Sequence, residues 1–193
     1  MCAMTEDTAL DTRICEPGMT AGEIEMLLFA LQRSRAQFAW KCGGKLGAAG
    51  LNQAHPPSAM TLGGLLKHST WLSTKTGSPP SGSLMGRSHR RGGLAISRPI
   101  PSGTGWHSAA DDFPEELYAL WRGAVERLDG ALAAMLADGG ADQPTKFTIS
   151  TGESPNLRGM LVDLHDEYAR HVGHADLFRE SVDGLVGEDP PQP

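Results

Sequence analysis

Apolar residues recur every three or four positions in four stretches of this chain, which is the spacing that places side chains along one face of a helix. The four apolar stripes are Ile24, Leu27, Leu28, Leu31 and Phe38; Leu62, Leu65, Leu66 and Leu72; Leu117, Trp121, Ala124, Leu128, Leu132 and Met135; and Met160, Leu164 and Phe178. The pattern predicts helices over about residues 21–41, 61–72, 114–137 and 155–183.

Local signals mark the ends of these helices. The starts are marked, in chain order, by a capping-box pattern at Thr20 and Glu23, by Thr61, by Pro114, and by Ser154 ahead of Pro155. Gly184 is suited to end the fourth helix. Between the first two helices, residues 43–60 are rich in Gly and Pro and predict a loop, and residues 145–153 predict a small turn or hairpin.

Four amphipathic helices without a convincing set of strands indicate an all-α fold, a four-helix bundle with an irregular connection between its second and third helices. We expect a flexible leader over residues 1–18, a bundle domain over 19–187 and a frayed tail over 188–193. The connection over 73–105 is rich in Ser, Gly, Pro and Arg, contains no acidic residue, and is expected to be a disordered loop.

Composition narrows the class of protein. The chain has 193 residues, 39% of them hydrophobic, and a net charge of −6, which suits a single domain and argues against general nucleic-acid binding. No apolar run reaches the roughly 20 residues that span a membrane. The three cysteines lack disulfide or zinc-finger spacing, and the first 17 residues lack a secretion signal, so the cytoplasm is the expected compartment.

The fourth helix carries polar residues where core residues are expected. One line along it reads Met160, Leu164, Glu167, His171, His174 and Phe178, in steps of three or four. A carboxylate on a buried line is costly unless it is paired or bound to a metal. Glu167 and His171 are four residues apart, so both can reach one ion from adjacent turns. The spacing therefore indicates a metal site, although a simple intrahelical pair between these two residues fits it as well.

His68 offers a third ligand, because it shares a stripe of the second helix with Leu65 and Leu72. Two histidine nitrogens and one carboxylate oxygen form a set that zinc accepts, and Fe(II) or Ni(II) remain possible. His174 could hold one of the ligands in place or lie at the rim of the site. His165 is expected to face solvent. The positions of the loop histidines His55, His89 and His107 give little indication of a functional role.

Three segments resemble actinobacterial members of the DinB-like superfamily. They are Met19 to Glu25, Thr61 to His68 and Glu167 to Leu177, and the stretch from Trp106 into the third helix also fits. The superfamily includes mycothiol-dependent maleylpyruvate isomerase and bacillithiol transferases. The resemblance implies a four-helix bundle whose single metal is held by a histidine of the second helix, at His68, and by a Glu-x-x-x-His pair of the fourth, at Glu167 and His171.

The resemblance also implies a reaction. We expect a metal-dependent thiol S-transferase or isomerase that uses a low-molecular-weight thiol such as mycothiol on a small electrophile. A non-catalytic metal-binding bundle or degraded pseudoenzyme is the alternative. A nucleic-acid-associated protein that uses the basic cluster Arg87, Arg90 and Arg91 is a weaker one. Members of the superfamily often form homodimers, so a homodimer is possible here.

Residues 72–105 depart from the family pattern, which stops soon after His68 and resumes at Trp106. We interpret this stretch as the product of a shifted reading frame, with a natural surface insertion as the alternative, and the coding DNA distinguishes the two. Gly77 and the pair Pro79-Pro80 cannot continue a helix, so the second helix is expected to lose its second half. The expected consequences are reduced stability and weak or absent activity.

Overall fold

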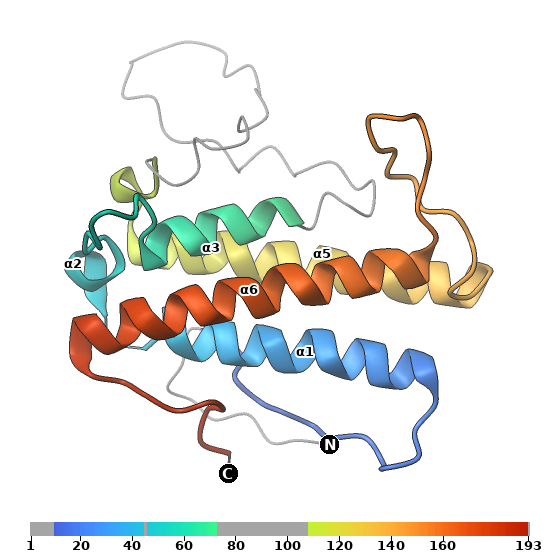
Figure 1. Cartoon of the computed structure of the whole chain (residues 1–193), viewed down its shortest axis with the longest axis horizontal. Helices are drawn as coiled ribbons and strands as arrows, with labels where there is room; N and C mark the ends of the chain where they lie inside the picture. Colours follow the sequence, from blue (N-terminus) through green and yellow to red (C-terminus); the bar gives the residue numbers. More distant parts are fainter. Residues whose placement is uncertain (1–9, 45, 73–107, 193) are drawn as a thin grey trace.

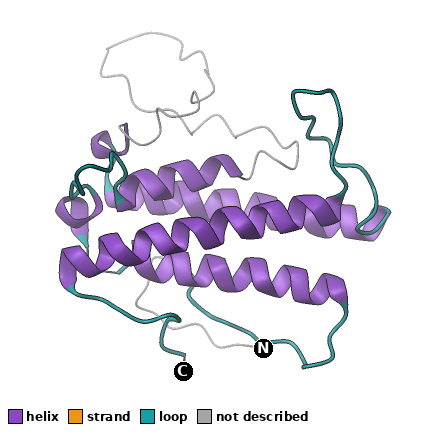
Figure 2. Cartoon of the chain, in the orientation of Figure 1, coloured by secondary structure: helices purple, strands orange, loops and turns teal. Residues whose placement is uncertain are grey.

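The computed structural model of the chain describes residues 10–44, 46–72 and 108–192. In this part of the chain the long helices are α1 (Glu23–Cys42), α3 (Leu62–Trp71), α5 (Pro114–Asp138) and α6 (Leu157–Asp183), accompanied by the short α2 (Gly47–Leu51) and the single turn η2 (Ala109–Asp111). Figure 2 shows helices and loops, and no strand, over the described residues. The predicted all-α fold is confirmed.

Several predicted helix ends are confirmed. The Thr61 hydroxyl caps α3 by accepting a hydrogen bond from Gly64 N at 3.0 Å. Pro114 opens α5, where the Glu116 carboxylate accepts a hydrogen bond from Phe113 N at 3.2 Å. Gly184 ends α6 with a φ of 78°, a left-handed conformation that glycine adopts without strain.

Two predicted caps and one predicted loop are wrong. α1 begins at Glu23 without a side-chain cap, and the Glu23 carboxylate instead accepts a hydrogen bond from Arg158 Nε of α6 at 2.9 Å. α6 begins two residues later than expected, because the Asn156 side chain caps it by accepting from Gly159 N at 2.8 Å. The predicted loop over residues 43–60 contains α2.

The four long helices pack as two pairs, α1 against α6 and α3 against α5 (Figure 1). Figure 1 also shows that α1 and α6 run in one direction along the bundle, whereas α3 and α5 run in the other. Since neighbouring parallel helices need a connection that returns along the bundle, a long segment has to separate α3 from α5. Residues 73–105, and with them the expectations of disorder and of a shifted reading frame, lie outside the described residues.

An aromatic group joins three helices at the centre of the core. The Phe38 ring of α1 lies 5.8 Å from the ring of Trp121 in α5 and 5.7 Å from that of Tyr168 in α6. The Arg35 guanidinium lies over the Tyr168 ring, and its Nη1 donates to Asp129 Oδ1 of α5 at 2.6 Å. Because Tyr168 follows Glu167, this packing sets the rotation of α6 next to the candidate site.

Polar contacts tie the end of α1 and both described chain ends to the bundle. Arg179 of α6 donates to Lys41 O at 3.0 Å and to Gly43 O at 2.7 Å, which satisfies carbonyls at the C-terminus of α1. Asp189 accepts from Arg33 at 3.1 Å, and the Gln192 amide bridges Thr12 O and Ile14 N. The segment expected to fray over 188–193 therefore makes specific contacts over its described residues. None of the described helices has the length and apolar character that crossing a membrane requires.

Candidate metal centre

α6 places its polar line toward the interior as the spacing predicts. Met160 and Leu164 are buried at the start of the line and Phe178 is buried at its end. Between them, the side chain of His171 is 7% exposed and that of Glu167 is 25% exposed. The site is therefore deep at His171 and open to solvent on the side of Glu167.

α3 is held by contacts on nearly every side. Eight of its ten residues are buried, and the two that are not buried are His68 and Trp71. The buried Lys67 ammonium donates to Ser108 O at 3.1 Å and forms an ion pair with Asp112, just before α5. Because Lys67 is fixed toward α5, the neighbouring His68 is turned toward α6.

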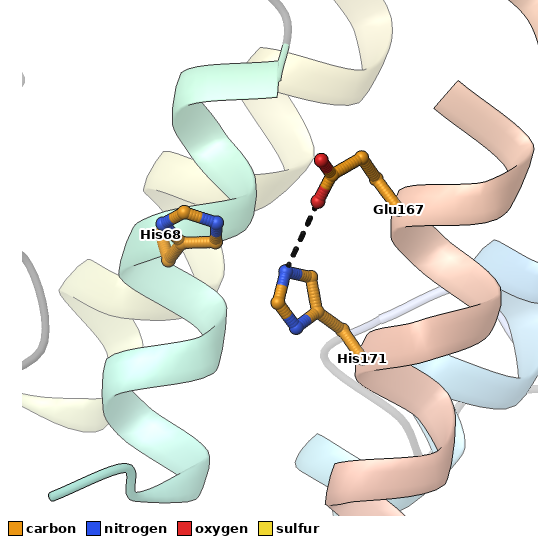
Figure 3. A group of neighbouring side chains, drawn as sticks. All are labelled: His68, Glu167 and His171. Atoms are coloured by element: carbon orange, nitrogen blue, oxygen red, sulfur yellow. Dashed lines mark ion pairs between the residues drawn. The ribbon is translucent and has the colours of Figure 1, made fainter. Parts of the chain in front are cut away.

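The three residues that the sequence singles out come together between these helices (Figure 3). His68, Glu167 and His171 each offer one ligand atom, and these atoms all lie within 4.8 Å of one another. His171 Nε2 is 3.5 Å from Glu167 Oε2, and the rings of His68 and His171 meet edge to face with centroids 4.9 Å apart. That these residues bind a metal stays a prediction.

The protonation of His171 bears on how the group can act. The pKa of His171 is lowered to about 4, mainly by burial and to a smaller extent by the neighbouring His68, His174 and Arg170. The imidazole is therefore neutral near pH 7, which is the form that coordinates a metal. An intrahelical ion pair with Glu167 would require the protonated form, which the lowered pKa opposes. The donor set and its protonation thus fit a divalent cation.

His174 lies behind His171 on the same line. Its ring is 5.7 Å from that of His171, and its Nδ1 is buried without a hydrogen-bond partner among the described residues. A role in holding a ligand stays a prediction. His165, expected in solvent, is half-buried.

His55 and Cys42, both among the described residues, do not belong to the candidate site. His55 stacks on Phe178 at 4.2 Å, and its Nδ1 is 3.0 Å from Ser181 Oγ, so this loop histidine anchors the chain after α2 to the end of α6. Burial raises the pKa of the Cys42 thiol, which opposes a nucleophilic role. His89, His107 and the basic cluster Arg87, Arg90 and Arg91 lie outside the described residues.

Sequence reasoning missed two residues beside the site, Lys67 and Trp71. The indole of Trp71 is 46% exposed and its ring lies 6.5 Å from that of His68. The signal available in the sequence was the three-residue spacing from His68 to Trp71, which places both on one face of α3. Lys67 gave a weaker signal, because only the fold reveals its partner Asp112.

Comparison with known protein families identifies the family of this chain. Residues 26–184 match the family model described as MST, Mycothiol-S-transferase. No curated protein and no solved structure matches the chain. Because the matched range covers most of the 193 residues, the chain belongs to the mycothiol-S-transferase family.

Proposed function

We propose that this member of the mycothiol-S-transferase family binds one divalent metal, zinc being the first choice, through His68, Glu167 and His171, and transfers the thiol of mycothiol to a small electrophile. The observation that carries the proposal is the convergence of the three ligand atoms within 4.8 Å. The family assignment supports the thiol, and the two-nitrogen, one-oxygen donor set supports zinc while leaving iron and nickel as alternatives.

A bound divalent cation lowers the pKa of a thiol that coordinates it, and so supplies a thiolate near neutral pH. The residues of this chain provide the conditions for that chemistry. His171 offers a neutral, buried nitrogen, and Glu167 contributes the negative charge that a cation requires. The partial exposure of Glu167 and His68 leaves the thiol a path from solvent. His174 supports the orientation of His171 from behind.

The transfer step balances without an oxidant or reductant. The sulfur of the thiolate forms a new bond to an electrophilic carbon, and the leaving group departs with the electron pair of its bond to that carbon. The thiol proton passes to solvent. When the electrophile is an activated double bond instead, the same proton is returned to the adduct, and no group leaves.

The test measures the metal content and the rate of thiol conjugation on the same purified protein. We expect about one zinc per chain and a mycothiol-dependent conjugation of 1-chloro-2,4-dinitrobenzene, in which a carbon–sulfur bond forms and chloride leaves. Removal of the metal with a chelator should abolish the rate, and zinc should restore it. A thiol-dependent rate that persists without metal would refute the metal role. Metal without any such rate, across several electrophiles, would indicate a non-catalytic metal-binding bundle.

A further inference from the structure

Trp71 is exposed on a helix that is otherwise almost completely buried. Of the residues of α3, only His68 and Trp71 are not buried, and they lie one turn apart on the same face. The indole is 46% exposed, whereas Trp121 in the core is 3% exposed. A half-exposed aromatic side chain beside a ligand group is a common feature of binding sites, because indole offers wide apolar contact with little conformational freedom to lose.

The open side of the candidate metal centre coincides with this indole. His171 is at the buried end, and the more exposed His68 and Glu167 form the side through which a ligand would arrive. The ring of Trp71 lies 6.5 Å from that of His68 on this side. A thiol whose sulfur reaches the three ligand residues therefore brings the rest of its molecule close to the indole.

Among the described residues, the charges around the exposed His68 and Glu167 favour a neutral ligand over an anionic one. The basic residue nearest to His171 along α6 is Arg170, which is bound to Asp166 at 2.7 Å on an exposed face. The rim also carries the Glu167 carboxylate. A phosphate or carboxylate group would call for a cation such as arginine directed at it, whereas an uncharged, hydroxyl-bearing ring can lay its apolar C–H face on indole.

We propose that Trp71 is a thiol-binding residue whose indole stacks on the sugar portion of mycothiol, which rests on the function proposed above. Mycothiol is an acylated cysteine attached to a pair of hydroxylated rings, so the sulfur and the stacking surface belong to different parts of one molecule. His68, Glu167 and His171 take the sulfur end, and Trp71 takes a ring. The indole thereby selects mycothiol over small thiols that lack the sugar.

The experiment compares two thiols on zinc-loaded protein. Binding of mycothiol and of N-acetylcysteine is measured by calorimetry for the wild type, Trp71→Ala and Trp71→Phe, with zinc content determined for each. Leu177→Ala is the matched control, since Leu177 is an exposed apolar residue of α6, 67% exposed, on another face. We expect Trp71→Ala to weaken mycothiol binding by about five- to tenfold and to leave N-acetylcysteine binding unchanged. Trp71→Phe should retain most of the affinity, and Leu177→Ala all of it.

Each other outcome overturns a distinct claim. Unchanged mycothiol binding in Trp71→Ala removes the indole from the site. Equal losses for both thiols, with zinc retained, would place the effect at the sulfur end and overturn the sugar contact. If the zinc-loaded wild type binds neither thiol, the proposed function fails and this inference fails with it. A variant that loses zinc would make Trp71 a support of His68, which also overturns the sugar contact.

Discussion

The two helices that carry the candidate metal ligands, α6 and α3, differ in how their sequences place those ligands. α6 has 27 residues and an ordinary amphipathic pattern, and its ligands Glu167 and His171 stand out as polar residues on a core line. α3 has 10 residues, of which eight are buried, so it has no polar face against which His68 could stand out. A long helix therefore carries its orientation in its own sequence, whereas a short buried helix takes it from its neighbours.

Removing the deepest ligand should have the largest effect. We expect His171→Ala to lower the metal content from about one ion per chain to nearly none, because the nitrogen that it removes is the buried member of the three. Metal is measured by mass spectrometry after dialysis. His165→Ala, on the same helix but off the line, is the control and should retain its metal. Full retention in His171→Ala would show that His171 is not a ligand.

Breaking the anchor of α3 should cost more stability than any change on the exposed face of α6. Lys67→Met leaves the Asp112 carboxylate, whose side chain is 11% exposed, without its cation. We expect a loss of roughly 3–5 kcal/mol in the free energy of unfolding, measured in urea. The double variant Lys67→Met, Asp112→Leu should recover most of this loss, since neither charge then remains buried. A loss below about 1 kcal/mol in the single variant would mean that other contacts hold α3.

The buried histidine of α6 should make the metal-free protein sensitive to acid. The folded pKa of His171 is about 4, below the ordinary value of 6.5, so the unfolded chain takes up the proton first as the pH falls. This contribution to stability is fully present above pH 6.5 and is lost between about 6.5 and 4. The size of this contribution is roughly 1–3 kcal/mol.

The measurement compares unfolding in urea at about pH 7.5 and pH 4.5 for the wild type and His171→Leu, both with a chelator present. Acidic groups that titrate in both proteins cancel in the comparison. The wild type should lose more stability on acidification than the variant. Equal losses would contradict the pKa assigned to His171.

The smallest effect is expected on the exposed face of α6. Arg170 and Asp166 form an ion pair four residues apart, with side chains 56% and 64% exposed. Arg170→Ala should lower the free energy of unfolding by about 0.3–0.5 kcal/mol and leave the metal content unchanged. A loss comparable to that of Lys67→Met would mean that the exposed face of α6 contributes as much to stability as the anchor of α3.

The four long helices and the polar line on α6 can be recognised from the sequence alone. Helical periodicity depends on the spacing of residues along one segment, so it can be recognised without knowing which elements pack nearby. For the same reason, Glu167 and His171 could be paired from their spacing alone. Caps are also local, yet Thr20 and Ser154 failed as predicted caps. In the structure Glu23 binds Arg158, and the Asn156 amide caps α6.

The surroundings of the site follow from the tertiary fold alone. The parallel course of α3 and α5, the ion pair between Lys67 and Asp112, and the stacking of His55 on Phe178 join residues far apart in the chain. The same holds for the exposure of Trp71, because an indole is recognised as open only after every other face of α3 is seen to be covered. Burial depends on all the elements that pack around a residue, and no local pattern contains that information.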